Sequence, residues 1–170
     1  MQKFILWLMG PTSAGKTTLA TYFAKEWRKV NHPIIHFDGD EIRDFFGAGF
    51  GFEPEDRMLV ISALVNLALK SQEAGLSVII SALTANEEAR QFLKNNIPHA
   101  LVGYVKCPIK VCAERDPKGL YAKAKYGEIN TLIGFNTPYL PPESPDIVLD
   151  TASSCPSDLF SLTDRFLREL

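Results

Sequence analysis

Residues 10–17 read Gly10-Pro11-Thr12-Ser13-Ala14-Gly15-Lys16-Thr17 and match the pattern G-x-x-x-x-G-K-[ST] in full. A loop of this kind turns several backbone N–H groups toward phosphate oxygens, and the helix that follows adds the positive end of its dipole. We expect Lys16 to reach the β- and γ-phosphates of a nucleotide and Thr17 to offer its hydroxyl to Mg²⁺. The pattern therefore predicts an ATP·Mg²⁺ site on residues 10–17 and the adjoining Thr18. We expect that a Cβ on either glycine would crowd the phosphates.

Two carboxylates flank a glycine directly after the short apolar run Ile34–Phe37, in the order Asp38-Gly39-Asp40. If that run is a strand of a parallel sheet, its end faces the ligand crevice. Carboxylates there can hold a metal, a role we expect for Asp38, or accept a proton from an attacking hydroxyl. Arg43 would share a helix face with Asp40 and could clamp an anionic acceptor. The alternative is a helix N-cap followed by solvated charges.

Glu114-Arg115-Asp116-Pro117-Lys118 opens a long irregular region, about residues 116–145, that is rich in glycine and then in proline. Long irregular segments in compact domains are commonly functional lids. Arg115 and Lys118 are suited to close over transferring phosphates. We therefore predict a lid at about 116–140. A charged, solvated helix end is the alternative.

The elements that must position these groups alternate along the chain. Apolar runs predict strands at 3–9, Ile34–Phe37, 76–82, 99–105 and Ile147–Leu149, and the segments between them predict helices at 15–29, 41–46, 54–74, 86–95, 108–114 and 157–169. Alternating strands and helices indicate a parallel sheet that helices cover on both faces. We predict an α/β fold with a five-stranded parallel sheet, and one P-loop kinase domain over residues 1–170.

Composition and charge limit the kinds of partner that the protein could bind. The 170 residues are 46% hydrophobic and 22% charged and carry a net charge of −2, which argues against a nucleic-acid partner because such proteins usually carry a basic excess. The three cysteines form no disulfide framework, and we expect reduced, buried or semi-buried thiols. The apolar run Phe4–Met9 is too short to span a bilayer. We expect a cytoplasmic protein without a membrane partner. The sequence does not decide between a monomer and a homodimer.

Further motifs are more specific than the phosphate loop. They are Phe37-Asp38-Gly39-Asp40 with Arg43, Gly51-Phe52-x-Pro54-Glu55-Asp56-Arg57, Arg115-Asp116-Pro117-Lys118-Gly119-Leu120-Tyr121, Gly127-Glu128-Ile129, Pro138-Tyr139 and Asp146-Ile147-Val148-Leu149-Asp150-Thr151. In these runs the chain resembles the adenylylsulfate (APS) kinases over residues 3–151. The resemblance implies a cytoplasmic phosphotransferase of sulfate assimilation that uses MgATP to phosphorylate the 3′-hydroxyl of adenosine 5′-phosphosulfate.

The resemblance also implies roles for the matching positions. Catalysis would fall to Lys16, Asp38, Asp40 and Lys118, with the duties of the two aspartates left undivided. The small-molecule nucleotide acceptor would contact Asp38, Asp40, Arg43, Phe52, Arg57, Lys118 and Leu132, with Phe52 stacking on its base. Arg115 and Lys118 would lie over ATP, and Thr151 would border its adenine.

The chain departs from the family on the acceptor side. After Arg57 the family continues with Glu-Asn and a pair of arginines, whereas this chain has Met58-Leu59-Val60-Ile61-Ser62-Ala63. Leu132 replaces a second stacking phenylalanine, unless Phe135 substitutes for it, and Thr84-Ala85-Asn86 replaces Ser-Pro-Tyr/Phe. A related kinase for another nucleotide, such as a cytidine diphosphate derivative in polysaccharide modification, is therefore an alternative. An ATPase switch without an acceptor is a second one.

Overall fold

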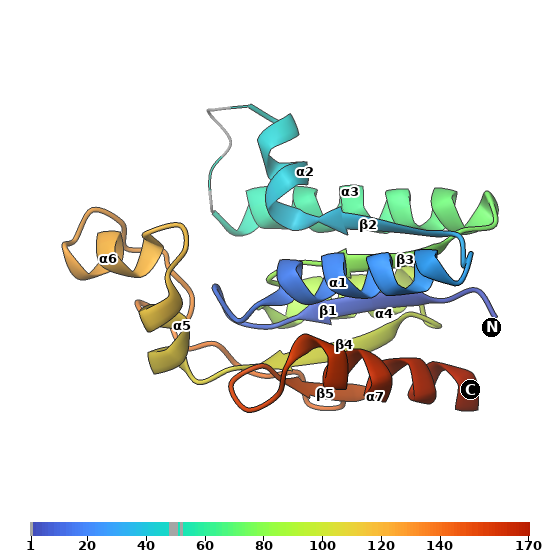
Figure 1. Ribbon diagram of the computed structural model, residues 1–170. Coiled ribbons are helices and arrows are strands. Elements are labelled where there is room, and N and C mark those ends of the chain that lie inside the picture. The colour runs from blue at the N-terminus through green and yellow to red at the C-terminus, as the bar shows by residue number, and fades with distance from the viewer. Residues whose placement is uncertain (1, 48–50, 52) are drawn as a thin grey trace.

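The computed structural model describes residues 2–47, 51 and 53–170 and has a parallel sheet at its centre (Figure 1). The strands are β1 (Ile5–Met9), β2 (Ile34–Asp38), β3 (Ser77–Ser81), β4 (Leu101–Lys106) and β5 (Ile147–Asp150). They are hydrogen-bonded in the order β2-β3-β1-β4-β5, and every neighbouring pair is parallel. All five strands therefore end at one edge of the sheet, and the segments that leave this edge build the site.

Helices cover the sheet on both faces. The helices are α1 (Lys16–Lys29), α2 (Gly39–Phe45), α3 (Pro54–Glu73), α4 (Glu87–Asn96), α5 (Ile109–Arg115), α6 (Leu120–Lys125) and α7 (Pro156–Glu169). Figure 1 shows α1 and α7 side by side over one face. Helices α3 and α4 pack against each other and, with the opposite face, enclose a second core.

Strand β1 shows why the fold has two cores. All five of its residues are buried, and side chains alternate between faces along a strand. Leu6 and Leu8 join the core under α1 and α7, while Trp7 and its neighbours of the same parity, Ile5 and Met9, join the core under α3 and α4. A central strand that is apolar at every position is what a sheet covered on both faces requires.

The predicted α/β architecture is confirmed, because every predicted strand and helix is present near its predicted place. Helix α6 was missed, since we expected the whole of 116–145 to be irregular. All three cysteines are free thiols, but the expectation that they are buried or semi-buried is wrong for Cys155, which is exposed. Among the described residues no helix is both long and apolar enough to cross a membrane.

Candidate active site

The phosphate loop runs from the end of β1 into α1, and its two glycines are required for different local reasons. A Cβ on Gly10 would clash with the carbonyl oxygen of Val105 in β4. Gly15 has φ +93°, a backbone conformation that favours glycine, and immediately precedes α1. Both requirements arise within the protein, so our explanation that a Cβ would crowd the phosphates is not needed to account for either glycine.

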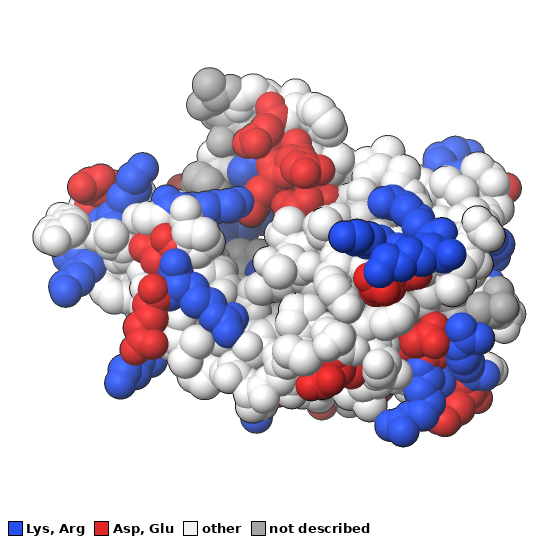
Figure 2. All heavy atoms as spheres, viewed as in Figure 1, with Lys and Arg blue, Asp and Glu red and all other residues white. Residues whose placement is uncertain are grey.

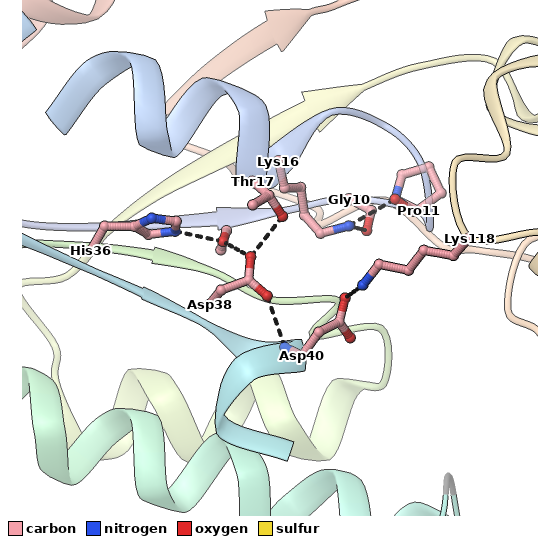
Figure 3. Close-up of polar contacts among 9 residues, drawn as sticks. Gly10, Pro11, Lys16, Thr17, His36, Asp38, Asp40 and Lys118 are labelled. Atoms are coloured by element: carbon pink, nitrogen blue, oxygen red, sulfur yellow. Dashed lines mark hydrogen bonds and ion pairs between the residues drawn. The ribbon is translucent and has the colours of Figure 1, made fainter. Parts of the chain in front are cut away.

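Lys16 lies in the first turn of α1, and its ammonium points back into the loop (Figure 3). Its Nζ donates to the carbonyl oxygen of Gly10 at 2.9 Å and to that of Pro11 at 2.8 Å. Burial lowers the pKa of Lys16 to about 8, and the nearby carboxylates of Asp40 and Asp38 only partly offset this effect. The loop thus holds a cation in a poorly solvated place, where it would attract phosphate strongly.

Asp38 ends β2 and is held by three donors. The Thr17 hydroxyl and the Ser81 hydroxyl each donate to its Oδ2 at 2.6 Å, and the backbone N–H of Asp40 donates to its Oδ1 at 2.9 Å. Burial alone would raise the pKa of Asp38, but these hydrogen bonds outweigh it and hold the pKa below its usual value. A buried, ionised carboxylate therefore stands next to the hydroxyl of the phosphate loop.

His36 extends this network, although no sequence pattern pointed to it. Its Nε2 lies 2.8 Å from the Ser81 hydroxyl, which in turn donates to Asp38 (Figure 3). His36 and Asp38 lie two residues apart on β2, and the β2–β3 register places Ser81 beside Asp38. Only the pairing of these strands, which is not visible in a single sequence, could have identified His36 and Ser81.

Asp38 and Asp40 both line the cleft, but Asp40 points toward Lys118 whereas Asp38 points toward Thr17. The Asp40 carboxylate accepts a hydrogen bond of 2.5 Å from Lys118, which precedes α6 (Figure 3). Both side chains remain solvent-accessible, 62% for Asp40 and 57% for Lys118. The predicted lid therefore contacts α2 directly at one of the two predicted catalytic aspartates.

The predicted acceptor residues line the same cleft from α2 and α3. Arg43 donates to the carbonyl oxygen of Gly51, and Arg57 donates to the carbonyl oxygen of Thr131 at 3.1 Å. Burial lowers the pKa of both arginines from its usual value, yet each stays protonated at neutral pH. Phe52 lies outside the described residues.

The two hydrophobic residues considered for the second stacking position have different surroundings. Leu132 borders the cleft and is largely buried in the core under α1 and α7. Phe135 is half exposed and is not among the residues that line the cleft. In this structure Leu132, and not Phe135, is the hydrophobic residue presented to the predicted acceptor.

Arg115 and Thr151 meet at the other end of the phosphate loop. Arg115 donates to the carbonyl oxygen of Thr151 at 2.6 Å and to its hydroxyl at 3.3 Å. The Thr151 hydroxyl donates to the carbonyl oxygen of Ala14 at 2.7 Å. These contacts join the end of α5, the end of β5 and the loop, as a shared nucleotide site would require.

One cleft of about 1020 Å³ connects these groups. It is lined by Thr12, Ser13, Gly15, Lys16, Thr17 and Thr18 of the loop region, and by Asp38, Asp40, Arg43, Arg57, Arg115, Lys118, Leu132 and Thr151. Gly10, Pro11 and Ala14, which we also predicted to bind the cofactor, are buried and do not line it. In Figure 2 acidic side chains gather over α2, on one side of the hollow, and basic side chains lie toward α6 on the other.

Comparisons with known proteins agree with one another. The family described as adenylylsulphate kinase matches residues 2–150. The probable adenylyl-sulfate kinase of Pyrococcus abyssi is 35% identical over 170 residues, covering 100% of this chain and 98% of the other. The adenylyl-sulfate kinase of Oceanobacillus iheyensis is 36% identical over 149 residues, covering 86% and 75%. The Mycobacterium tuberculosis APS kinase solved with AMPPNP and APS superposes with a TM-score of 0.92 at 26% identity, with 98% of each chain covered.

Proposed function

Because the chain belongs to the adenylylsulphate kinase family, we propose that it transfers the γ-phosphoryl group of ATP to the 3′-hydroxyl of adenosine 5′-phosphosulfate. The observation that carries this proposal is the convergence on one cleft of the phosphate loop, the two aspartates after β2 and the arginines of α2 and α3. In the reaction the acceptor oxygen forms a bond to the γ-phosphorus, the bond from that phosphorus to the bridging oxygen breaks, and ADP leaves.

Thr17 and Asp38 would hold Mg²⁺. The residues fit this ion, because a hydroxyl and a carboxylate oxygen lie 2.6 Å apart beside the phosphate loop, and Mg²⁺ usually takes one or two carboxylates together with substrate phosphates. Within the described part of the chain no cluster of three or more His, Cys, Asp or Glu side chains offers a fuller cage. Bound Mg²⁺ would neutralise charge on the transferring phosphoryl group.

Asp40 is the better candidate to orient the acceptor hydroxyl and accept its proton. Its carboxylate is open to the cleft, whereas three donors occupy that of Asp38. A proton acceptor must come within hydrogen-bond reach of the reacting hydroxyl, and the exposure of Asp40 supports that role. Lys118, now paired with Asp40, lies where it could shift toward the phosphates as the reaction proceeds.

Arg43 and Arg57 would hold the phosphosulfate of the acceptor. Both line the cleft, Arg43 from α2 and Arg57 from α3, and guanidinium groups pair with such oxyanions through charge-assisted hydrogen bonds. The wall beside them includes Val60, Ile61 and Ala89. In the stretch where the family has an asparagine and a pair of arginines, the residues that line the cleft are Val60 and Ile61. The choice of acceptor is therefore the point to test first.

The test is a coupled assay of ADP release with MgATP that compares APS with CDP, CMP and other nucleotides, with the position of the new phosphate determined by NMR. We expect turnover with micromolar APS and a 3′-phosphate in the product. Turnover on a cytidine nucleotide without a response to APS would instead support a rebuilt acceptor site. ATP hydrolysis that no nucleotide changes would support a switch without an acceptor.

A further inference from the structure

Arg90, in the first turns of α4, joins two segments that lie far apart in the sequence. Its Nε donates to the carbonyl oxygen of Thr84 at 3.1 Å, and its Nη1 donates to that of Pro141 at 3.2 Å. Its Nη2 donates to the carbonyl oxygen of Leu140. The side chain is only 12% exposed. A planar guanidinium can serve both segments at once, because its donors point in fixed, divergent directions.

The first segment is a wall of the cleft. Thr84 is buried, has φ +41° and lines the cleft together with Ala85 and Asn86. Its hydroxyl accepts a hydrogen bond of 2.9 Å from the indole N–H of Trp7 in β1, the strand that leads into the phosphate loop. Thr84 is therefore fixed relative to the phosphate loop. A group that is hydrogen-bonded to Thr84 is fixed relative to the phosphate loop as well.

The second segment is the end of the predicted lid, where the chain returns toward the sheet. Leu140 and Pro141 follow a compact loop in which Gly134 donates to the carbonyl oxygen of Thr137 at 2.7 Å. Thr137 lines the cleft, as does Leu132. Arg90 also lies over the ring of Tyr139, 5.8 Å from its centroid, and that ring stacks on Tyr104 of β4.

The charge of Arg90 does not explain this arrangement. Among the residues that the structure describes, the acidic group within ion-pair distance is Glu87, at 4.0 Å, and its side chain is 78% exposed, so the pair contributes little. The guanidinium instead donates hydrogen bonds to three backbone carbonyls, and such contacts fix the path of the backbone. A lysine could not reproduce them, because its single ammonium cannot reach both segments in the same way.

We propose that Arg90 is a positioning residue for phosphoryl transfer: it fixes the returning end of segment 116–140 against Thr84 and so places the loop 132–137 as a wall of the acceptor site. This inference rests on the proposed function, since it assigns the acceptor side of the cleft. Arg90 touches neither predicted substrate, and it acts through the backbone that it holds.

The experiment compares Arg90→Met with the matched control Arg28→Met. Arg28 also donates through Nε and Nη2 to a backbone carbonyl, that of Ile34, at 3.3 Å and 3.1 Å, but Ile34 begins β2 at the opposite edge of the sheet from the cleft. We expect Arg90→Met to raise KM for APS about 10-fold or more, while the Kd for AMPPNP measured without acceptor changes less than about 3-fold. Arg28→Met should leave both constants unchanged.

Hydrogen exchange of the ligand-free proteins provides a second readout that needs no acceptor. Amides of residues 132–140 should exchange faster in Arg90→Met than in Arg28→Met or the unaltered protein. Arg90→Lys, which keeps the charge and most of the stem, should show the same changes at smaller size, and it replaces Arg90→Met if that variant does not fold.

Equal KM for APS and equal exchange of 132–140 in the Arg90 and Arg28 variants would overturn the proposal and leave Arg90 as a general stabiliser. If the unaltered protein releases no ADP with APS, the proposed function fails by itself. The exchange comparison would then still decide whether Arg90 holds the end of the segment.

Discussion

Asp38 and Asp40 are the same residue type two positions apart, yet their surroundings differ completely. Asp38 is 4% exposed and accepts hydrogen bonds from Thr17, Ser81 and a backbone N–H. The side chain of Asp40 is 62% exposed and pairs with Lys118. The helix start at Gly39 turns the chain between them. These surroundings support the proposal of Asp38 as a fixed, ionised carboxylate beside the metal and of Asp40 as a solvent-accessible carboxylate that can meet a hydroxyl.

Ser81→Ala tests the hydrogen-bond support of Asp38. The Ser81 hydroxyl stabilises the charged carboxylate, so its loss should raise the pKa of Asp38 and move the acid limb of the pH–rate profile to higher pH. We expect kcat at pH 4 to fall more than kcat at pH 7, because the loss of one hydrogen bond to the carboxylate shifts its pKa by about one unit. Steady-state kinetics between these pH values measure the shift.

Ser77→Ala is the matched control for this variant. Ser77 lies four residues earlier on β3, is also buried, and its hydroxyl lies 2.7 Å from His32 and accepts the Phe4 N–H at 3.2 Å. Its removal should reduce the free energy of unfolding by about 1 kcal/mol without a shift in the pH–rate profile. Identical profiles for both serine variants would contradict our assignment of Asp38.

Lys16→Ala should abolish measurable transfer, a loss of at least about 100-fold in kcat, because it removes the loop cation that meets the phosphates. The fold should remain. Burial lowers the pKa of Lys16 to about 8, so the buried charge reduces the free energy of unfolding of the ligand-free protein at neutral pH. Removal of the ammonium therefore also removes this destabilising effect. Lys29→Ala, an exposed position on the same helix, is the control, and retained turnover in purified Lys16→Ala would contradict the mechanism.

At the scale of single residues, prediction was possible where the candidate site lies in a contiguous pattern. The geometry of residues 10–17 is determined locally, because the strand, the loop and the helix follow each other in the chain. His36, Ser81 and Arg90 were missed because each acts on a partner that only tertiary structure brings near. Ser81 lies 43 residues from Asp38, and Arg90 lies 51 residues from Pro141.

At the scale of elements, apolar patterns predicted the strands and the amphipathic helices, but they did not predict α6. Its six residues bury only Tyr121 and Ala124, which is too short a pattern to reveal a helical period, and an isolated helix of this length is unstable. It is started by Asp116, whose carboxylate accepts the N–H groups of Tyr121 at 3.1 Å and Ala122 at 3.0 Å. This acceptor stands several residues before the helix and across Gly119, outside the usual capping spacing.

The pair of helices α1 and α7 offers a prediction on stability. Asp164 of α7 accepts hydrogen bonds from the Trp27 indole at 2.8 Å and from Arg168 at 2.7 Å. Burial alone would raise the pKa of Asp164, but these donors lower it overall. Its stabilising effect is therefore present above the pKa of the unfolded chain and is lost as the pH falls toward the lower folded pKa.

Asp164→Asn should accordingly reduce the free energy of unfolding by about 1–2 kcal/mol at pH 7, and the difference from the unaltered protein should shrink as the pH falls from 5 to 3. Urea unfolding at each pH measures it. Glu26→Gln is the control, because Glu26 makes an ion pair with the exposed Lys29 on the same α1. A difference that stays constant across this pH range would show that the Asp164 carboxylate is not responsible.

At the scale of the whole molecule, the site exists because five parallel strands end at one edge. The phosphate loop follows β1, Asp38 ends β2, Thr84 follows β3, and Thr151 follows β5. Fold class and this convergence follow from alternating elements, so the sequence was sufficient to predict them. The neighbours of segment 116–140 were beyond it, because its glycines and prolines determine local turns but not what the segment packs against.

The ion pair between Lys118 and Asp40 joins segment 116–140 to α2 across the cleft. Both side chains are more than half exposed, so the pair should contribute no more than about 0.5 kcal/mol to the free energy of unfolding. Its position in the proposed active site nevertheless predicts a large effect on catalysis. Lys118→Met should therefore unfold at nearly the same urea concentration as the unaltered protein while its kcat falls about 10- to 100-fold.

Lys125→Met is the control, since Lys125 lies exposed at the end of α6 and does not line the cleft. Combining Lys118→Met with Asp40→Asn completes a double-mutant cycle in kcat. If the two residues act as a unit during transfer, the double variant should lose much less than the product of the two single losses, because the partner of each is already gone. Independent, multiplicative losses would mean that the contact seen in the ligand-free structure is broken before the phosphoryl group moves, and that Lys118 and Asp40 then serve separate substrates.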